Sequence, residues 1–307
     1  MHFMFRVTFL GTGGTLPTPD RNPSSIFINR EGDMMLFDCG EGTQQQMMRA
    51  KTGMKLSAIY ITHFHADHFL GIPGIIQTMS FNGREEPLDI YGPVWTKQFV
   101  DLLVQLGYYR LGFVINAHEL KNGDIIDKGD YSIKAVGTDH GIPSLGYVLE
   151  EKKRTGRFNR EKAIELGVPV GRLFSKLQNG EAIIINGKTI LPSQVIGQSR
   201  PGRKIVYSGD TRPCENLEKE SMGADLLIHD STLGEDLKDW ALETKHSTST
   251  EAARVAKNAK VKQLILTHIS SRYSEKRDLL LHEAMNVFEK TRLAEEMMEI
   301  EIQLSDK

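Results

Sequence analysis

The chain has 307 residues and a formal net charge of -2, and 39% of its residues are hydrophobic and 25% charged. This length is typical of one large or two medium domains with a substantial core. No run approaches the roughly 18 apolar residues of a membrane span, so we expect no integral membrane protein. The two cysteines, Cys39 and Cys214, cannot form a disulfide framework, which indicates a reducing compartment, the cytoplasm.

The first third of the chain predicts short strands that alternate with helices. Apolar, β-prone runs indicate strands at 6–11, 24–30, 34–40, 57–63 and 88–92, and helical periodicity indicates helices at 42–52, 68–80 and 94–106. The segment 1–11 lacks a basic start, a long apolar stretch and a small-residue cleavage site. We therefore interpret it as the first strand and not as a signal peptide.

The remaining two thirds continue this alternation. Strands are predicted at 113–120, 131–138, 144–150, 204–210, 224–230 and 261–269, and helices at 213–221, 248–259 and 275–291. Strands in both halves with interleaved helices predict a layered α/β protein with two sheets between helices.

A basic insertion separates the two halves. Between Lys152 and Lys204 there are twelve lysines and arginines but only three acidic residues, so the segment carries +9 and the rest of the chain is acidic. Such a charge imbalance is typical of a surface that binds a polyanion, although a solvated linker would also be lysine-rich. Apolar residues such as Phe158 and Phe174 give the segment some capacity to fold. We predict a small protruding module, inserted at about 152–200 into a catalytic domain that spans 1–307.

The most specific motif is THFHADH at residues 62–68, which follows a predicted strand and begins a predicted helix. On an extended segment His63 and His65 point to the same side, so both can reach one metal ion. Asp67 and His68, at the turn into the helix, can face a neighbouring site. Imidazole and carboxylate ligands suit zinc well, and manganese or iron less so.

Four later polar residues each stand at the end of a predicted strand: His140, Asp210, His229 and His268. Polar residues in such positions tend to collect at one edge of a sheet, where α/β proteins build active sites. Singly, each could be a buried histidine or a helix-capping aspartate. Together with the HxHxDH motif they predict two ligand sets around a shared carboxylate, the two-metal arrangement for phosphoester hydrolysis.

HxHxDH followed by separate His, Asp and His residues resembles the metallo-β-lactamase superfamily. Within it the chain resembles the ribonuclease Z family, endonucleases that remove the 3′ trailer from precursor tRNA. The resemblance covers nearly the whole chain through the segments FLGTGGTLPTPDRNPSS, FDCGEGTQQQM, ITHFHADHFLGIPGII, YGP, SGDTRP, KHSTSTEAA and LILTHISSRY. It implies an α/β fold, an αβ/βα sandwich of two mixed sheets between helices, with a protruding basic arm where the insertion lies.

The resemblance also implies two zinc ions per subunit, with seven residues as their ligands. The first zinc would be held by His63, His65 and His140, the second by Asp67, His68 and His268, and Asp210 would bridge the two.

Two residues have implied catalytic roles. Asp67 would also accept the proton of the attacking water, and His246 would protonate the leaving oxygen or stabilise its charge. The family's His-Glu-Ala-Thr is His229-Asp230-Ser231-Thr232 here. If that carboxylate orients His246, as in histidine–carboxylate pairs generally, Asp230 must do so with a side chain one methylene shorter than glutamate. His229 would lie beside Asp230, outside the ligand sets.

The resemblance further implies cleavage that leaves a 3′-hydroxyl on the tRNA and a 5′-phosphate on the trailer, in a cytoplasmic homodimer whose partner is precursor tRNA and not a membrane. We expect the apolar stretch Phe69–Ile76 to be exposed and to form the subunit contact. In the arm, the family's Gly-Pro is Gly171-Arg172 here, so we assign no role to single arm residues.

Three alternatives remain open at this point. A thioesterase, lactamase or arylsulfatase of the same superfamily would need no basic arm, and assays on the corresponding substrates would separate them. An RNA-binding protein that no longer cleaves would keep a closed, four-coordinate zinc site and not a binuclear one. A flavodiiron-type redox protein would have an acid where this chain has His65.

Overall fold

The structure is a computed structural model that describes residues 5–107 and 110–304. The chain divides into two compact units: residues 1–149 with 204–303, and residues 150–203 with 304–307. The first predicted strand is observed from Phe5 onward, and residues 1–4 of that segment lie outside the described residues. In the described part of the chain, no helix has the length and apolar character needed to cross a membrane.

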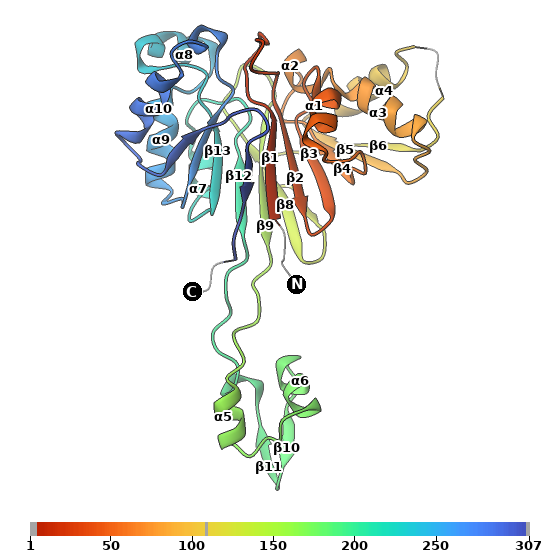
Figure 1. Ribbon diagram of the computed structural model, residues 1–307, viewed down its shortest axis with the longest axis vertical. Coiled ribbons are helices and arrows are strands. Elements are labelled where there is room, and N and C mark those ends of the chain that lie inside the picture. The colour runs from red at the N-terminus through yellow and green to blue at the C-terminus, as the bar shows by residue number, and fades with distance from the viewer. Residues whose placement is uncertain (1–4, 108–109, 305–307) are drawn as a thin grey trace. The chain divides into compact units, whose positions relative to one another are not determined.

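The larger unit contains two seven-stranded sheets (Figure 1). The first sheet has the spatial order β16 (Glu299–Glu301), β1 (Phe5–Gly11), β2 (Ser25–Arg30), β3 (Asp33–Phe37), β4 (Ala58–Tyr60), β5 (Leu88–Gly92) and β6 (Ile115–Glu119). The second has the order β15 (Thr291–Leu293), β14 (Leu264–Thr267), β13 (Leu226–Asp230), β12 (Lys204–Tyr207), β9 (Leu145–Glu151), β8 (Tyr131–Gly137) and β7 (Ile125–Asp127). Both sheets are mixed. β1 pairs antiparallel with β2, and β7 with β8, whereas neighbouring strands pair parallel in the run from β3 to β6 and in the run from β12 to β15.

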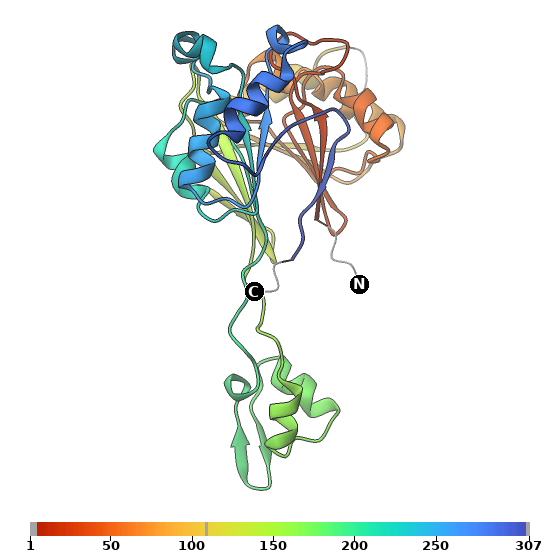
Figure 2. The same ribbon diagram turned by 60° about the vertical axis from the view of Figure 1, so that its left-hand side comes forward.

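Helices cover the outer face of each sheet (Figures 1 and 2). The first sheet is covered by α1 (Thr43–Ala50), α2 (Ala66–Phe69), α3 (Ile72–Phe81) and α4 (Thr96–Val104), and the second by α7 (Glu215–Glu220), α8 (Lys238–Thr244), α9 (Ser249–Asn258) and α10 (Arg277–Met285). Two short 3-10 helices, η2 (Glu235–Leu237) and η3 (Ser271–Tyr273), lie in the second half. The predicted αβ/βα sandwich is confirmed.

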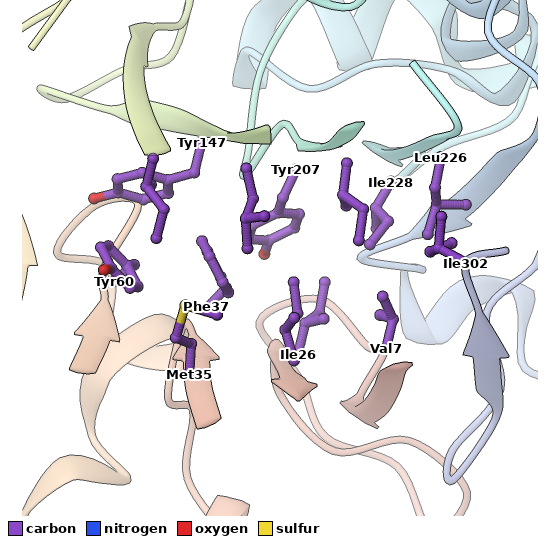
Figure 3. Close-up of a cluster of buried hydrophobic side chains, with 14 of the residues drawn as sticks. Val7, Ile26, Met35, Phe37, Tyr60, Tyr147, Tyr207, Leu226, Ile228 and Ile302 are labelled. Carbon is purple, nitrogen blue, oxygen red and sulfur yellow. The ribbon is translucent and has the colours of Figure 1, made fainter. Parts of the chain in front are cut away.

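The core between the sheets is built by alternation along the strands. In β4, Tyr60 faces the other sheet while Ile59 packs against the helices, because successive strand residues point to opposite faces. Figure 3 shows side chains of the two sheets meeting in this layer, with Phe37 and Tyr60 opposite Tyr147 and Tyr207. The Phe37 and Tyr60 rings stack with centroids 4.9 Å apart. This layer fixes the two sheets against each other and so fixes the strand ends that carry the site.

The predicted helix 68–80 is interrupted. α2 ends at Phe69 and α3 begins at Ile72, because Pro73 in the first turn of α3 has no N–H to donate to the carbonyl of Phe69 and cannot continue a helix. The N–H of Gly71 donates instead to the carbonyl of Cys39 at 2.8 Å, and a Cβ at Gly71 would lie 2.2 Å from the carbonyl oxygen of Gly40. The expectation that Phe69–Ile76 is exposed is wrong for most of its side chains. Phe69, Ile72, Ile75 and Ile76 are buried in the protein's own core, and Leu70 is the large apolar side chain of the stretch that remains exposed.

The smaller unit has secondary structure and a core of its own. It contains α5 (Arg160–Glu165), α6 (Arg172–Gln178), β10 (Ile183–Ile185), β11 (Lys188–Ile190) and the 3-10 helix η1 (Pro192–Gln194). Its buried apolar side chains are Ala163, Val168, Leu177, Ile183, Ile190 and Val195. The chain enters and leaves through two segments that pair at Arg154 with Arg200 and at Phe158 with Ile196. The basic segment is therefore a folded module and not a solvated linker.

Candidate metal centre

Polar side chains from five separate parts of the chain meet at one edge of the sandwich. Three groups could each hold a metal ion: His63, His65, His140 and Asp210; Asp67, His68 and His268; and Asp210, His246 and His268. Within each group one ligand atom per residue lies within 4.8 Å of the others. The structure thus brings together all seven predicted ligands, with His246 beside them.

The strands explain why these residues meet. β4 ends at Tyr60 just before the HxHxDH motif, β12 ends at Tyr207 just before Asp210, and β14 ends at Thr267 just before His268. Since β12, β13 and β14 run parallel, their carboxyl ends open on the same edge, where α/β proteins place ligands.

The chemistry of the cluster fits a cation. The buried carboxylate oxygen Oδ2 of Asp210 lies 3.3 Å from Nε2 of His68 and of His268, and 3.6 Å from Nε2 of His63. The other oxygen, Oδ1, and the Nε2 atom of His68 are buried without a hydrogen-bond partner among the described residues. Buried polar atoms are rarely left in that state, and a cation between them would satisfy both.

Burial and charge set the ionisation that ligands need. Burial alone would raise the pKa of Asp210, but the neighbouring charges of His268, His68 and His63 hold it well below the usual range. Burial lowers the pKa of His63 well below its ordinary value, and that of His65 falls for the same reason. Burial alone would lower the pKa of His68, but the carboxylates of Asp210 and Asp38 raise it well above its ordinary value. Ionised carboxylates and neutral imidazoles are the forms that bind metal ions, so His68 would give up a proton when an ion binds.

Asp38 is a residue of the centre that the sequence analysis missed. Its Oδ2 accepts hydrogen bonds from Nδ1 of His68 at 2.8 Å and from the hydroxyl of Tyr207 at 2.7 Å, and its Oδ1 accepts one from the backbone N–H of Thr62 at 2.8 Å. The bond from Nδ1 leaves Nε2 of His68 as the ligand atom. Asp38 directly follows β3, so the rule that found Asp210 at a strand end applies to it as well.

The cluster opens to solvent at His65 and His140. His65 is exposed and His140 is half-buried, whereas His63 and His68 are fully buried. The Nδ1 atom of His140 donates to the backbone carbonyl of Lys245 at 3.0 Å, so Nε2 is the free ring nitrogen, and it faces Nδ1 of His65 at 3.2 Å. A phosphodiester could therefore approach the ligands from this side.

His246 and Asp230 form a close pair next to the ligands. Nδ1 of His246 lies 2.9 Å from Oδ2 of Asp230, which is fully buried, and 3.9 Å from Oδ2 of Asp210. Burial alone would lower the pKa of His246, but the charge of Asp230 and the hydrogen bond to it raise the pKa to about 9. Asp230 therefore reaches His246 although its side chain is one methylene shorter than that of glutamate.

His229 is the one predicted residue that the structure does not bring to the cluster. It is fully buried, its Nδ1 contacts the backbone carbonyl of Asp230 at 2.8 Å, and its Nε2 has no hydrogen-bond partner among the described residues. The alternation along β13 is the reason, because it directs position 229 away from the face on which Ile228 lies, the face between the sheets.

Comparisons with known proteins identify the family of the chain. Residues 5–155 match the family model described as anti-Pycsar protein Apyc1, and residues 186–269 match a beta-lactamase superfamily domain. Ribonuclease Z of Methanosarcina acetivorans is 58% identical over 300 residues, which cover 97% of this chain and 98% of that protein. Ribonuclease Z of Archaeoglobus fulgidus is 49% identical over 301 residues, with 97% and 98% coverage. The chain belongs to the ribonuclease Z family.

Solved structures support the same family. Human tRNase Z, short form, superposes with a TM-score of 0.72 at 31% identity, over 97% of this chain and 100% of that one. The metallo-beta-lactamase fold protein YhfI of Bacillus subtilis, 20% identical with a TM-score of 0.69 over 97% of this chain and 99% of that one, shares the fold. The predicted resemblance is confirmed, and family membership puts the protein among nuclease-type hydrolases and not among the thioesterases, lactamases or arylsulfatases.

Proposed function

We propose that the protein is a zinc-dependent endoribonuclease that cleaves the 3′ trailer from precursor tRNA, leaving a 3′-hydroxyl on the tRNA and a 5′-phosphate on the trailer. The observation that carries the proposal is the pair of ligand groups around the buried Asp210, open to solvent at His65 and flanked by the His246–Asp230 pair, in a chain of this family. We propose further that it works in the cytoplasm as a homodimer, as the family resemblance implies.

Seven residues would hold two zinc ions per subunit. The first ion would be held by His63, His65 and His140 and the second by Asp67, His68 and His268, and Asp210 would serve both. A set rich in imidazole with few carboxylates is the ligand chemistry that zinc prefers. When bound, the two cations lower the pKa of the attacking water and offset negative charge on the phosphate.

Asp67 and His246 move the protons in this mechanism. Burial alone would raise the pKa of Asp67, but the hydrogen bond from His268 and the charge of His68 lower it to about 2, so the carboxylate is ionised at neutral pH, the form that can accept the water's proton. Because Asp230 occupies Nδ1 of His246, Nε2 is the atom that donates to substrate. As the water oxygen bonds to phosphorus and the bond to the 3′-oxygen breaks, that oxygen receives the proton of His246.

The folded basic module would bind the folded part of the tRNA. Its surface holds a cavity of 530 Å³ lined by residues that include Arg157, Arg200, Phe158 and Gln178. Guanidinium groups suit phosphates and an aromatic ring suits a base, and folded RNA is recognised mainly through shape and phosphate contacts. We therefore propose the unit 150–203 as the tRNA-binding arm.

Cleavage of an end-labelled precursor tRNA, mapped to the nucleotide, tests the proposal. A single cut at the trailer junction, lost with a chelator and restored by zinc, is the expected result, and the 3′ end of the product should be a hydroxyl. Asp210→Ala serves as the matched inactive variant. Tight binding of the precursor without any cut would instead identify an RNA-binding protein that no longer cleaves.

A further inference from the structure

Three loops of the site meet at one residue, Arg212, that belongs to none of the ligand groups. The loops are 138–140, which carries a candidate ligand, 210–212, which carries Asp210, and 245–247, which carries His246. Arg212 contacts the other two loops directly. Its backbone N–H donates to the carbonyl of Asp139 at 2.8 Å, and its guanidinium Nη1 donates to the carbonyl of His246 at 2.6 Å.

The rest of the guanidinium is held by Glu251 on α9. Nη1 of Arg212 lies 2.6 Å from Oε2 of Glu251, and Nη2 donates to Oε1, so the pair is bidentate. The two side chains are only 12% and 9% exposed, which protects the pair from solvent screening. Burial alone would raise the pKa of Glu251, but the hydrogen bond from Arg212 lowers it, so the carboxylate is ionised at neutral pH.

Glu251 lies on a rigid support. It caps α9 reciprocally with Thr248: its N–H donates to the threonine Oγ1, and its Oε2 accepts from the threonine N–H at 3.0 Å. The following residues Ala252 and Ala253 are fully buried in the core of the second sheet. The ion pair thus connects the loop of His246 to a helix that cannot shift without disturbing the core.

The ring and the backbone of His246 are both held against the residues that follow Asp210. Asp230 accepts from the ring at 2.9 Å and also from the backbone N–H of Thr211 at 3.0 Å, while Arg212 holds the carbonyl. Asp230 fixes the direction of the ring but makes no contact with this carbonyl among the contacts described.

We propose that Arg212, held in place by Glu251, is a positioning residue that keeps His246 at a fixed distance from Asp210. This inference rests on the proposed function of His246 as proton donor.

Substitution of Arg212 tests this through the leaving group. Because a displacement of about 1 Å can cost about 10²-fold in rate, Arg212→Ala should lower kcat for precursor tRNA by about 10- to 100-fold, with KM nearly unchanged. Bis(p-nitrophenyl) phosphate releases a phenolate that needs no proton, so its hydrolysis should fall far less. Arg212→Lys, which keeps the charge but cannot bind both partners, should recover part of the loss.

Two controls separate positioning from general damage. In a His246→Ala background, Arg212→Ala should have little further effect, because the group it positions is gone. Lys134→Ala removes an ion pair away from the site, Lys134 with Glu220 at 2.7 Å between β8 and α7, and should leave both activities unchanged. Equal loss on both substrates, or a full additional loss in the His246→Ala background, would overturn the proposal.

A readout independent of activity decides the case if the wild type cleaves no RNA. Hydrogen–deuterium exchange should show faster exchange of peptides covering 243–250 in Arg212→Ala, with peptides covering β14 unchanged. Unchanged exchange in 243–250 would refute the positioning role. Faster exchange in a protein that cleaves nothing would leave that role standing and would instead reject the proposed reaction.

Discussion

Asp38→Asn should weaken metal binding although Asp38 is not itself a proposed ligand. Asp38 has φ of 55°, a conformation that asparagine tolerates as well as aspartate, so the substitution changes charge and hydrogen bonding and leaves the backbone alone. As an aspartate, it accepts from Thr62 through Oδ1 and from His68 and Tyr207 through Oδ2. An asparagine offers one acceptor oxygen where the aspartate offers two.

Either orientation of the new amide creates a conflict. If its NH2 group takes the place of Oδ1, it faces the N–H of Thr62, and a buried donor loses its acceptor. If it takes the place of Oδ2, it faces Nδ1 of His68, and the imidazole can relieve the clash only by moving its proton to Nε2, the ligand atom. Loss of such a supporting partner typically costs about 10- to 100-fold in metal affinity, or about 1.4 to 2.8 kcal/mol.

Competition with a chromogenic chelator measures this loss, and elemental analysis after dialysis gives the metal content. Tyr207→Phe is the matched control, because it removes one donor to Asp38 but leaves the carboxylate, and it should bind metal nearly as the wild type does. Since metal binding stabilises the folded state, Asp38→Asn should also gain less thermal stability on addition of zinc. A folded Asp38→Asn protein with wild-type metal affinity would refute the argument that Asp38 sets the tautomer of His68.

Four further outcomes are expected. His246→Ala should lower kcat for precursor tRNA about 10²- to 10⁴-fold, yet elemental analysis should find its metal content unchanged; an emptied site would make His246 a ligand. Asp67→Ala should lose activity and metal together by the same two measurements. Excision of 155–199, with Arg154 joined to Arg200 by a short glycine linker, should weaken precursor tRNA binding and flatten its salt dependence while bis(p-nitrophenyl) phosphate hydrolysis persists; equal loss of both would mean that the arm supports the fold. Burial raises the pKa of Glu296, so the folded state favours the protonated carboxyl. The contribution of Glu296 to the free energy of unfolding is therefore full below the unfolded pKa of about 4.3 and is lost as the pH rises through the folded pKa. Glu296→Gln should accordingly lower the free energy of unfolding in urea less at pH 8 than at pH 4.

The sequence predicted what depends on local periodicity. The strand expected at 88–92 is β5, and the polar residues that follow predicted strands lie where parallel strands end, so His268 and Asp210 meet the HxHxDH motif. The hairpin of the arm could also have been found. Asn186-Gly187 between β10 and β11 has φ of 49° and 76°, and Asn-Gly between apolar runs is the strongest short hairpin signal.

The missed parts depend on contacts between residues that lie far apart in the chain. Asp38 and Tyr207 are 169 positions apart, and Arg212 and Glu251 are 39 apart, so no local pattern links them. The strand-end rule could have marked Asp38, but its contact with Tyr207 and the Arg212–Glu251 pair become visible only when the fold brings the partners together.

The aspartate at position 230 shows how a departure from the family pattern is accommodated. Its Oδ1 accepts from the backbone N–H of Thr232 at 2.9 Å, a contact two residues along the chain that suits the short side chain of aspartate, and from the threonine hydroxyl at 2.7 Å. That same hydroxyl lies 2.8 Å from Nδ1 of His268 and 3.1 Å from Nδ1 of His246. A glutamate would carry its oxygens one methylene further into fully buried surroundings and would lose this turn. Asp230 therefore suits the loop that it begins, and through Thr232 it orients a candidate metal ligand as well as the proposed proton donor.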